Sequence, residues 1–500
     1  MLIDDLLRAT KERERDEGTL TPDLFADFNG MPKGVDKTEF YQHDQNWSNR
    51  MILGDSLQVM ASLAEREGLR GKVQCIYLDP PYGIKFNSNF QWSTTSRDVK
   101  DGNANQITRE PEQVKAFRDT WRNGIHSYLT YLRDRLTVAR DLLTDSGSIF
   151  LQIGDENVHR VRALMDEVFG EENFVSLIAF KKTSSASSKL LAGVCDYLVW
   201  FTKSRERIKY RALYYEKIAT GRGGEQYNLA KLLDGTVKSV RTSGDVAVLP
   251  HNARLFRHSP LTSQRPPGTF PVLLNGRPYN PKTGYWKTGE LGMDKLKKAD
   301  RLMAFGNTLE YVRYLNDFPA IPMANVWEDT VTSGFADPKV YVVQTGAKIV
   351  QRCILMTTDP SDLVLDPTCG SGTTATVAEQ WGRRWITIDT SRVALALARA
   401  RIMGARYPYY LLADSRDGQI KEGEVTRTAP SSQPVRENIR HGFVYERVPH
   451  VTLKSIANNA EIDVIWDKWQ ALLEPLREKL NTALRKQWQE WEIPREVDKA

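Results

Sequence analysis

An acidic residue, two prolines and an aromatic follow directly after an apolar stretch near the start of the chain. Residues 73–78 are predicted to form a buried strand, which ends in Asp79, Pro80, Pro81 and Tyr82. Each proline fixes φ and lacks an N–H, so the carbonyl groups around them stay available as hydrogen-bond acceptors. Asp79 adds a carboxylate, and Tyr82 adds a ring face for stacking. These groups suit the exocyclic amine of a flat ring such as a nucleobase, although an ordinary strand-to-loop junction has a similar composition.

A glycine-rich turn follows a second predicted strand much later in the chain. Residues 363–366 run into Gly370-Ser371-Gly372, and a helix-like stretch follows. Glycines let the backbone approach a ligand closely, and the N–H groups at a helix start suit a carboxylate. The next strand ends in Asp389, 17 residues after Gly372 (389 − 372), near the place where nucleotide-binding α/β folds carry an acid for the ribose hydroxyls. The lysine of a phosphate-binding loop is absent, so the pattern does not predict phosphate binding.

The order of the expected elements predicts an α/β fold with a doubly wound sheet. Strands are expected at 51–54, 73–78, 148–153, 174–180, 196–201, 363–366 and 384–389, and helices at 57–67, 125–143, 156–169 and 340–357. Ligands of such sheets bind at the carboxyl ends of the strands. Asp79 and Asp366 are 287 positions apart (366 − 79), but both end strands. They lie side by side if these two strands are neighbours.

Asp79-Pro80-Pro81-Tyr82 upstream of the motif 366–372 resembles the permuted (β-class) amino-methyltransferases of DNA, in which the catalytic motif precedes the cofactor motif. Residues 49–56 are similar to this group as well, and the whole looks most like the modification subunits of type III restriction systems. The resemblance covers roughly 46–204 and 320–415. It implies a Rossmann-like, mostly parallel sheet with one antiparallel strand, an inserted target-recognition domain and a helical C-terminal extension.

The resemblance also implies a role for individual residues. It assigns catalysis to Asp79, Pro80, Pro81 and Tyr82, and contacts with S-adenosylmethionine to Asp55, Gln344, Thr345, Lys348, Asp366, Pro367, Thr368, Cys369, Gly370, Ser371, Gly372, Thr373 and Asp389. Asp389 would hold the ribose hydroxyls, and Asp55 would lie by the adenine. The segment with Gln344, Thr345 and Lys348 would close over the methionine end. Thr368 stands where many members have Phe, and Ile349 where many have Pro.

The second wall of the base pocket is expected to involve Phe180 and Lys181, at the end of another strand. A core phenylalanine followed by solvated lysines is an equal alternative.

The activity that the resemblance implies is methylation of adenine N6 in a base flipped out of double-stranded DNA. Four alternatives stay open: methylation of cytosine N4, an RNA substrate, a catalytically silent DNA-binding module, and a nicotinamide dehydrogenase. The aspartate at the first motif position favours adenine within the resembled family. The intact acid, prolines and tyrosine disfavour a silent module, and a dehydrogenase does not need them.

Charge is distributed unevenly along the chain. Residues 205–320 carry 20 Lys or Arg and 10 Asp or Glu, a surplus of +10, which leaves −4 for the remainder of a chain of net charge +6. Basic residues interleaved with aromatics and turn-formers suit contact with DNA, although an insertion that only aids solubility has the same composition. The expected domains are an N-terminal segment at 1–45, a catalytic half at 46–204, a target-recognition insertion at 205–335, a cofactor half at 336–420 and a linker with a helical extension at 421–500.

The remaining features bear on location and partners. The four scattered cysteines favour a reducing compartment and indicate neither a disulfide framework nor a metal site. No apolar run is long enough for a membrane span, so we expect a protein of the prokaryotic cytoplasm. The resemblance permits a homodimer and a helicase-nuclease partner subunit. An apolar stripe at 463–490 has helical spacing, which favours an intramolecular packing face over a coiled coil.

Overall fold

The computed structural model describes residues 47–82, 124–183, 190–266, 268–331 and 344–494. The expected N-terminal segment at 1–45 and the expected loop at 83–112 lie outside these residues. The chain divides into two compact units, one made of residues 1–213 and 323–445 and the other of residues 214–322 and 446–500. No helix within the described ranges is long and apolar enough to cross a membrane.

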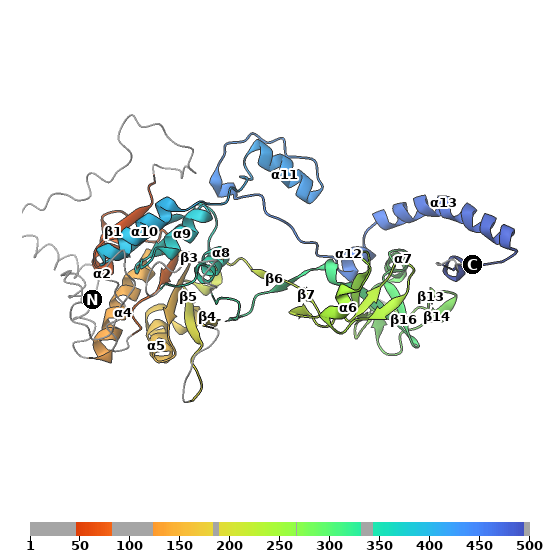
Figure 1. Cartoon of the computed structure of the whole chain (residues 1–500), viewed down its shortest axis with the longest axis horizontal. Coiled ribbons are helices and arrows are strands. Elements are labelled where there is room, and N and C mark those ends of the chain that lie inside the picture. Colours follow the sequence, from red (N-terminus) through yellow and green to blue (C-terminus); the bar gives the residue numbers. More distant parts are fainter. Residues whose placement is uncertain (1–46, 83–123, 184–189, 267, 332–343, 495–500) are drawn as a thin grey trace, which may run out of the picture. The chain divides into compact units, whose positions relative to one another are not determined.

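The first unit is built on an eight-stranded sheet (Figure 1). β5 is antiparallel to both of its neighbours, and all other neighbouring pairs are parallel. The strands, in their order across the sheet, are β1 (Arg50–Leu53), β21 (Arg384–Asp389), β20 (Leu363–Asp366), β2 (Val73–Leu78), β3 (Leu143–Ile153), β5 (Cys195–Thr202), β4 (Phe174–Lys181) and β19 (Val326–Trp327). The prediction of a mostly parallel sheet with one antiparallel strand is confirmed.

Helices cover both faces of this sheet. Side chains alternate along β2, so Ile76 and Leu78 pack into one apolar cluster and Cys75 and Tyr77 into another. The first cluster is completed by α2 (Ser56–Glu65), α4 (Ile125–Leu142) and α5 (Val158–Phe169). The second is completed by α8 (Ala347–Thr357) and α9 (Thr373–Gln380), with α10 (Arg392–Gly404) packed against α9, β1 and β21. Burial on both faces explains why these strands read as continuous apolar runs.

The two motif-bearing strands are direct neighbours. β2 pairs in parallel with β20, with Cys75 opposite Val364 and Ile76 opposite Leu365. The carboxyl ends of both strands therefore reach the same edge of the sheet, which confirms the expectation for Asp79 and Asp366.

Several element boundaries differ from the sequence prediction, and β3, for example, begins at Leu143 and not at 148. α8 begins at Ala347, and not at 340, because the extended Gly346 (ψ 135°) is its N-cap. Residues 344–346 therefore precede α8 without regular secondary structure. The expected polar linker at 422–433 begins as a helix, α11 (Arg416–Thr426), which Ser415 caps by accepting a hydrogen bond from Gly418 N–H. α11 ends at Arg427, which has a left-handed backbone (φ 56°).

The second unit combines the insertion with the C-terminal part of the chain. Its largest sheet is antiparallel, in the order β10 (Val237–Ser239), β9 (Leu229–Lys231), β11 (Arg254–Pro260), β17 (Thr308–Tyr314) and β16 (Leu302–Phe305). α7 (Glu290–Lys298) packs on this sheet through Met293 and Leu296. α12 (Leu453–Ala457) places Ile456 in the same cluster, so residues after 446 return to the insertion.

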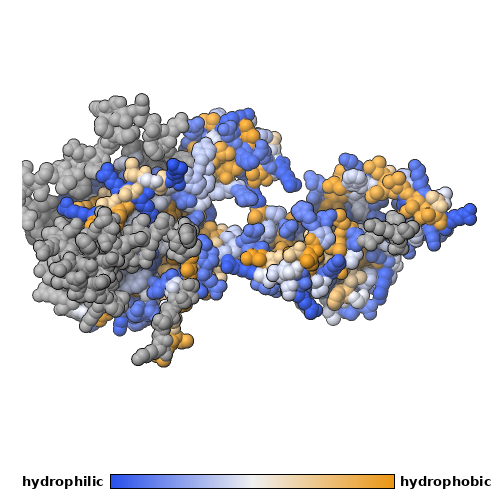
Figure 2. Space-filling model, in the orientation of Figure 1, coloured by the Kyte–Doolittle hydropathy of each residue, from blue (hydrophilic) through white to orange (hydrophobic). Residues whose placement is uncertain are grey.

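The last long helix, α13 (Glu461–Leu484), corrects one expectation. Its apolar stripe was expected to be an intramolecular packing face, but none of the helix residues is buried. Trp469, Leu472 and Leu476 are 55%, 56% and 59% exposed, and hydrophobic side chains are visible along α13 in Figure 2. The helix is attached at its start, where Asp463 accepts a hydrogen bond from Lys298 of α7 (2.8 Å). Helical spacing therefore predicted the element but not its burial.

Candidate active site

Asp79 lies at the end of β2 and forms hydrogen bonds with two residues, Thr368 and Thr345. Its backbone N–H donates to Thr368 Oγ1 (2.9 Å), and its carboxylate Oδ2 accepts from Thr345 Oγ1 (2.9 Å). Burial raises the pKa of Asp79 to about 7, the Thr345 hydrogen bond lowers it, and the charges of Asp366 and Asp196 raise it further. The motif aspartate is thus hydrogen-bonded to residues that lie 289 and 266 positions further along the chain.

Tyr82 is held by three hydrogen bonds. Its hydroxyl accepts from Gln152 Nε2 (2.8 Å) and donates to Asp196 Oδ2 (3.3 Å). Its backbone carbonyl accepts from Asn157 Nδ2 (2.8 Å). These hydrogen bonds fix the position of the ring beside the Asp79 corner, as a stacking platform requires.

The glycine-rich turn wraps around the end of β20. Asp366 Oδ1 accepts from the Thr368 N–H (2.9 Å), and burial raises the pKa of Asp366 to about 6. Gly370 and Gly372 have positive φ angles of 51° and 71°. A Cβ on Gly372 would lie 2.7 Å from Ala398 Cβ of α10, so this position requires glycine for two reasons. The other motif residues complete the turn, with Cys369, Ser371 and Thr373 buried: Pro367, Cys369, Ser371 and Thr373.

Asp389 is the last residue of β21, and its carboxylate holds the glycine-rich turn through a hydrogen bond from Gly370. Its Oδ2 accepts from the Gly370 N–H (2.9 Å), and its Oδ1 accepts from the Ser391 N–H (2.8 Å). Burial raises its pKa to about 6, against these two backbone hydrogen bonds. Since each carboxylate oxygen can accept more than one hydrogen bond, Asp389 keeps capacity for ribose hydroxyls while it holds the loop.

Asp55 lies at the same edge, because the Gly54 N–H donates to the Asp389 carbonyl (2.9 Å). Its carboxylate caps α2 by accepting from the Leu57 N–H (2.9 Å) and pairs with Arg135 Nη2 (2.6 Å). Asp55 therefore lies at the edge that carries Asp389, and these contacts are within the protein.

Thr345 lies just before α8 and Lys348 lies in its first turn, and the two side chains have different partners. Thr345 reaches Asp79, and its carbonyl accepts from Thr373 Oγ1 (3.4 Å). Lys348 is exposed and instead donates to the carbonyl of Asp329 (3.0 Å). Gln344 directly precedes Thr345 and is partly buried. The structure thus brings Thr345 to Asp79, whereas Lys348 contacts Asp329.

The two residues expected at the second wall of the base pocket have other surroundings. Phe180 is 2% exposed and lies in the apolar core, opposite Trp327 of β19. The Lys181 carbonyl accepts from Thr330 Oγ1 (2.7 Å). The core alternative therefore describes Phe180 better. The next residue, Lys182, donates from Nζ to Asp196 Oδ1 (2.8 Å), close to Tyr82.

Sequence reasoning missed Gln152, Asn157 and Asp196. The available signal was a polar residue in an otherwise apolar stretch: Gln152 is 5% exposed, and its neighbours Leu151 and Ile153 are fully buried. A buried amide without hydrogen bonds is costly, so such a residue indicates a polar partner on a neighbouring segment.

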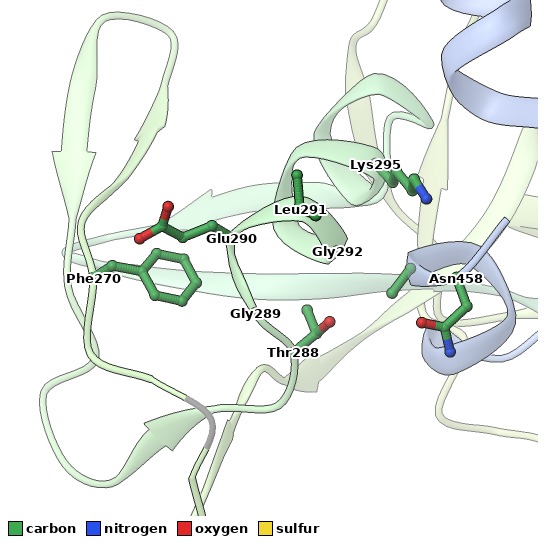
Figure 3. A pocket seen from close by; sticks show the side chains of 9 residues that line it. Phe270, Thr288, Gly289, Glu290, Leu291, Gly292, Lys295 and Asn458 are labelled. Carbon is green, nitrogen blue, oxygen red and sulfur yellow. The ribbon is translucent and has the colours of Figure 1, made fainter. Parts of the chain in front are cut away.

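A separate pocket lies within the second unit and contains none of the predicted site residues (Figure 3). It has a volume of about 590 Å³ and is formed around the start of α7, with Thr288, Glu290 and Lys295 as its polar side chains near Asn458. Its lining includes none of the three aspartates at the edge of the sheet, Asp79, Asp366 and Asp389.

The family model described as DNA methylase (N6/N4) matches residues 73–400, well over half of the chain. The chain belongs to this family of DNA methylases. The match spans both the Asp79 corner and the glycine-rich turn, so the family assignment and the geometry concern the same site.

Individual relatives agree with the family. The type II methyltransferase M.EcaI of Enterobacter cloacae is 27% identical over 80% of this chain and 76% of its own length. The StyLTI Mod subunit, part of a type III restriction-modification enzyme of Salmonella typhimurium, is 24% identical over 71% of this chain. The chain spans 54% of that subunit and 27% of the EcoP15I Mod subunit of Escherichia coli. It therefore matches most of a type II enzyme but about half or less of these type III subunits.

Among solved structures, the cytosine-N4-specific PvuII DNA methyltransferase is 16% identical, with a TM-score of 0.31 over 70% of this chain and 86% of that one. The complex of M1.HpyAVI with SAM is 11% identical, with the same TM-score, over 71% and 98% of the two chains. TM-scores of 0.31 do not support an argument about the fold, so the fold is described from the strand order of this chain.

Proposed function

We propose that this DNA methylase transfers a methyl group from S-adenosylmethionine to the N6 amine of an adenine flipped out of double-stranded DNA, within a restriction-modification system. The observation that carries the proposal is the joining of the two motifs, since Asp79 contacts Thr368 and Thr345 at 2.9 Å each. An amine-binding corner and a cofactor loop thus share one edge of the sheet.

The residues at this edge fit the methyl donor. Asp79, Asp366 and Asp389 end three adjacent parallel strands, and burial raises the pKa of all three, to about 7, 6 and 6. Such a cluster of buried carboxylates attracts a cation, and the donor is a sulfonium. The backbone N–H groups at the start of α9 suit its carboxylate, and Asp389 suits its ribose. When bound, the donor supplies an activated methyl group.

The protein's own contribution is to position the amine. Asp79 and the Pro80 carbonyl accept its two hydrogens, which turns the nitrogen lone pair toward the cofactor side. When the new N–C bond forms and the donor's S–C bond breaks, the nitrogen must lose a proton, and Asp79 is placed to accept it. A pKa near the working pH suits this role. Alignment of two bound reactants supplies up to about 7–11 kcal/mol of the barrier reduction.

Extrusion of the base costs a few kcal/mol in unstacking. Tyr82 offsets part of this cost, because a base stacked on an aromatic ring gains about 1–3 kcal/mol. The hydrogen bonds from Gln152 and to Asp196 keep the ring in place before the base arrives.

The pH dependence of the reaction follows from Asp79. A carboxyl group with a raised pKa of about 7 is protonated below that pH and then loses its acceptor character. We expect kcat to fall about tenfold per pH unit on the acid side, with a midpoint at or below about 7, since a bound cation favours the ionised form. The measurement is kcat from pH 5 to 9 at saturating cofactor and DNA. An unchanged kcat down to pH 5 would contradict the role of Asp79.

DNA contact is assigned to the second unit, in the role of target recognition. Exposed basic residues lie on several of its segments: Lys238, Arg241, Arg254, Arg265, Arg277, Lys282 and Lys287. Their charge suits the phosphate backbone, and the surplus of +10 along 205–320 lies mostly in this unit.

The salt dependence of DNA binding tests this assignment. Replacing Lys238, Arg241 and Lys282 with alanine should weaken binding and reduce the slope of log K against log salt by about 0.9 for each phosphate that the variant no longer neutralises. Arg70→Ala is the matched control, because Arg70 precedes β2 at the edge of the sheet opposite the site and pairs with Asp141 (2.7 Å). An equal effect of Arg70→Ala, or no effect of the triple variant, would place the DNA elsewhere.

Partners and location form part of the same proposal. The StyLTI and EcoP15I relatives are named as Mod subunits of type III restriction-modification enzymes. By analogy, this protein would form a homodimer and assemble with a helicase-nuclease subunit in the prokaryotic cytoplasm. Light scattering of the purified protein, alone and mixed with a candidate nuclease subunit, tests both associations.

The identity of the methylated base distinguishes methylation of adenine N6 from methylation of cytosine N4. The protein is incubated with plasmid and cofactor that carries a tritiated methyl group, and the DNA is digested to nucleosides. We expect the label in N6-methyldeoxyadenosine. Label in N4-methyldeoxycytidine would favour the cytosine alternative, which is chemically equivalent at an exocyclic amine. Absence of label, with DNA binding intact, would favour a silent DNA-binding module.

A further inference from the structure

Gln152 occupies a special position in the first unit. It lies on β3, one residue after Leu151, which pairs with Leu78 of β2. Gln152 therefore lies beside Asp79, at the edge of the sheet where the carboxyl ends of the parallel strands meet. Its side chain is 5% exposed and makes hydrogen bonds to three residues from two other segments of the chain.

The shorter hydrogen bonds around Gln152 have one consistent direction, although Thr345 Oγ1 also lies 3.3 Å from its amide oxygen. Its amide oxygen accepts from the Tyr77 hydroxyl (2.5 Å), so its amide nitrogen is free to donate twice. One N–H goes to the Tyr82 hydroxyl (2.8 Å) and the other to Thr345 Oγ1 (3.0 Å). A hydroxyl oxygen that accepts a hydrogen bond must direct its own single proton elsewhere.

That constraint and the distances together direct the two hydroxyl protons, since Asp79 Oδ2 is closer to Thr345 Oγ1 than Gln152 Oε1 is (2.9 against 3.3 Å). The Thr345 proton goes to Asp79 Oδ2 (2.9 Å), and the Tyr82 proton goes to Asp196 Oδ2 (3.3 Å). Lys182 neutralises the other oxygen of Asp196 (2.8 Å). Thr345 holds Oδ2 of Asp79 with a single hydrogen bond, so the carboxylate keeps capacity to accept from a substrate amine.

We infer that Gln152 is a positioning residue for methyl transfer, because it orients the Thr345 hydroxyl toward Asp79 and fixes the Tyr82 ring at the same time. It acts through these two residues and does not touch the reacting atoms. The inference rests on the proposed function, since it assigns Asp79 and Tyr82 to the binding of the amine.

The chain offers a matched control in Gln74. This residue is also a buried glutamine, 4% exposed, on neighbouring β2. Its amide donates to the carbonyls of Ser146 (3.0 Å) and Thr357 (3.1 Å), near the opposite edge of the sheet. Gln74→Met and Gln152→Met therefore remove the same group from similar surroundings, but only the second change affects the catalytic edge.

The first test compares these variants in methyl transfer. We expect Gln152→Met to lower kcat about 10²-fold, the cost of a misplacement of about 1 Å, while the Kd of the cofactor changes less than threefold. Gln74→Met should lose similar thermal stability but keep kcat within threefold. Thr345→Val should reproduce the part of the loss that acts through Asp79, and the double variant should be no worse than Gln152→Met, because Gln152→Met already removes the orientation of Thr345. Equal kcat losses in the two glutamine variants, or additive losses in the double variant, would overturn the inference.

The second test does not need turnover. The pKa of Asp79 lies above that of an ordinary aspartate, so the native state binds the extra proton and the Asp79-dependent stability falls as pH rises from about 4 to about 7. Subtracting the Tm of Asp79→Asn from that of its parent isolates this contribution. The hydrogen bond from Thr345 lowers the pKa of Asp79. Without it this pKa should rise, so the contribution should level off at a higher pH. Other ionisable groups that act on Asp79 or respond to its charge stay in every variant: Asp366, Asp196, Tyr77, Tyr82 and Tyr128.

The outcomes are distinguishable. If the parent protein transfers no methyl group, the proposed function fails, and the Tm series still tests the orientation of Thr345. If the parent is active and Gln152→Met shows neither a lower kcat nor a shifted Tm profile, only the role of Gln152 fails. If Gln152→Met does not fold, Thr345→Val and Thr345→Ser take its place, because serine keeps the hydroxyl and should restore both readouts.

Discussion

Asp79→Asn is expected to lower kcat by about 10²–10⁴-fold, the range for loss of a group that accepts a proton in the transition state. Asparagine keeps the size of the side chain and the backbone hydrogen bond to Thr368 (2.9 Å), so the cofactor turn should keep its shape. The Kd of the cofactor should therefore stay within a few-fold of the parent value, as measured by calorimetry alongside single-turnover methylation.

The control for this prediction is Asp362→Asn. Asp362 precedes β20 at the opposite edge of the same sheet, where it accepts a hydrogen bond from Lys209 (2.6 Å). Its replacement removes a carboxylate without touching the site and should leave kcat nearly unchanged. A loss of cofactor affinity in Asp79→Asn as large as its loss of kcat would show that Asp79 supports the cofactor and not the amine.

Gly372→Ala is expected to have the second large effect, on cofactor binding. The backbone at this position has φ 71°, which costs an L-residue about 1–2 kcal/mol. The new Cβ would also lie 2.7 Å from Ala398 Cβ and 3.2 Å from Ala398 Cα. Because α10 cannot yield at its backbone, the turn must shift, and we expect the Kd of the cofactor to rise at least about tenfold, the equivalent of about 1.4 kcal/mol.

Two further variants separate the steric contact with Ala398, the backbone strain at position 372 and a general loss of stability. Gly372→Ala combined with Ala398→Gly relieves the closest contact but keeps the backbone strain, so affinity should recover in part. Gly382→Ala is the matched control, with φ 67° and a Cβ that would meet Ile439 Cδ1 at 2.7 Å, away from the site. It should lower Tm without changing cofactor affinity. Equal affinity losses at positions 372 and 382 would attribute the effect to general instability.

Much of this architecture was predictable from local patterns. Apolar strands that end at Asp79 and Asp366 predicted two carboxylates side by side if the strands are neighbours, since parallel strands share their carboxyl ends. The pairing of β2 with β20 confirms that expectation. The glycines at 370 and 372 predicted a turn that ordinary residues cannot form, and both have positive φ angles.

The sequence was less informative where tertiary contacts decide. Phe180 was an equal candidate for pocket and core, because a strand end does not reveal what lies across it, and β19 covers it with Trp327. Gln152 was missed because its partners come from segments as far as 193 residues away in the chain. The stripe of α13 has the same spacing as a packed helix, yet Trp469 and Leu476 are more than half exposed.

The most direct test of the central claim is a crystal structure of the protein with a non-transferable cofactor analogue and a short duplex that contains its target. The account predicts that the analogue occupies the 370–372 turn and that the extruded adenine stacks on Tyr82, with its N6 within hydrogen-bond distance of Asp79. A cofactor bound away from that turn, or a base held in the pocket near Glu290 of the second unit, would contradict it.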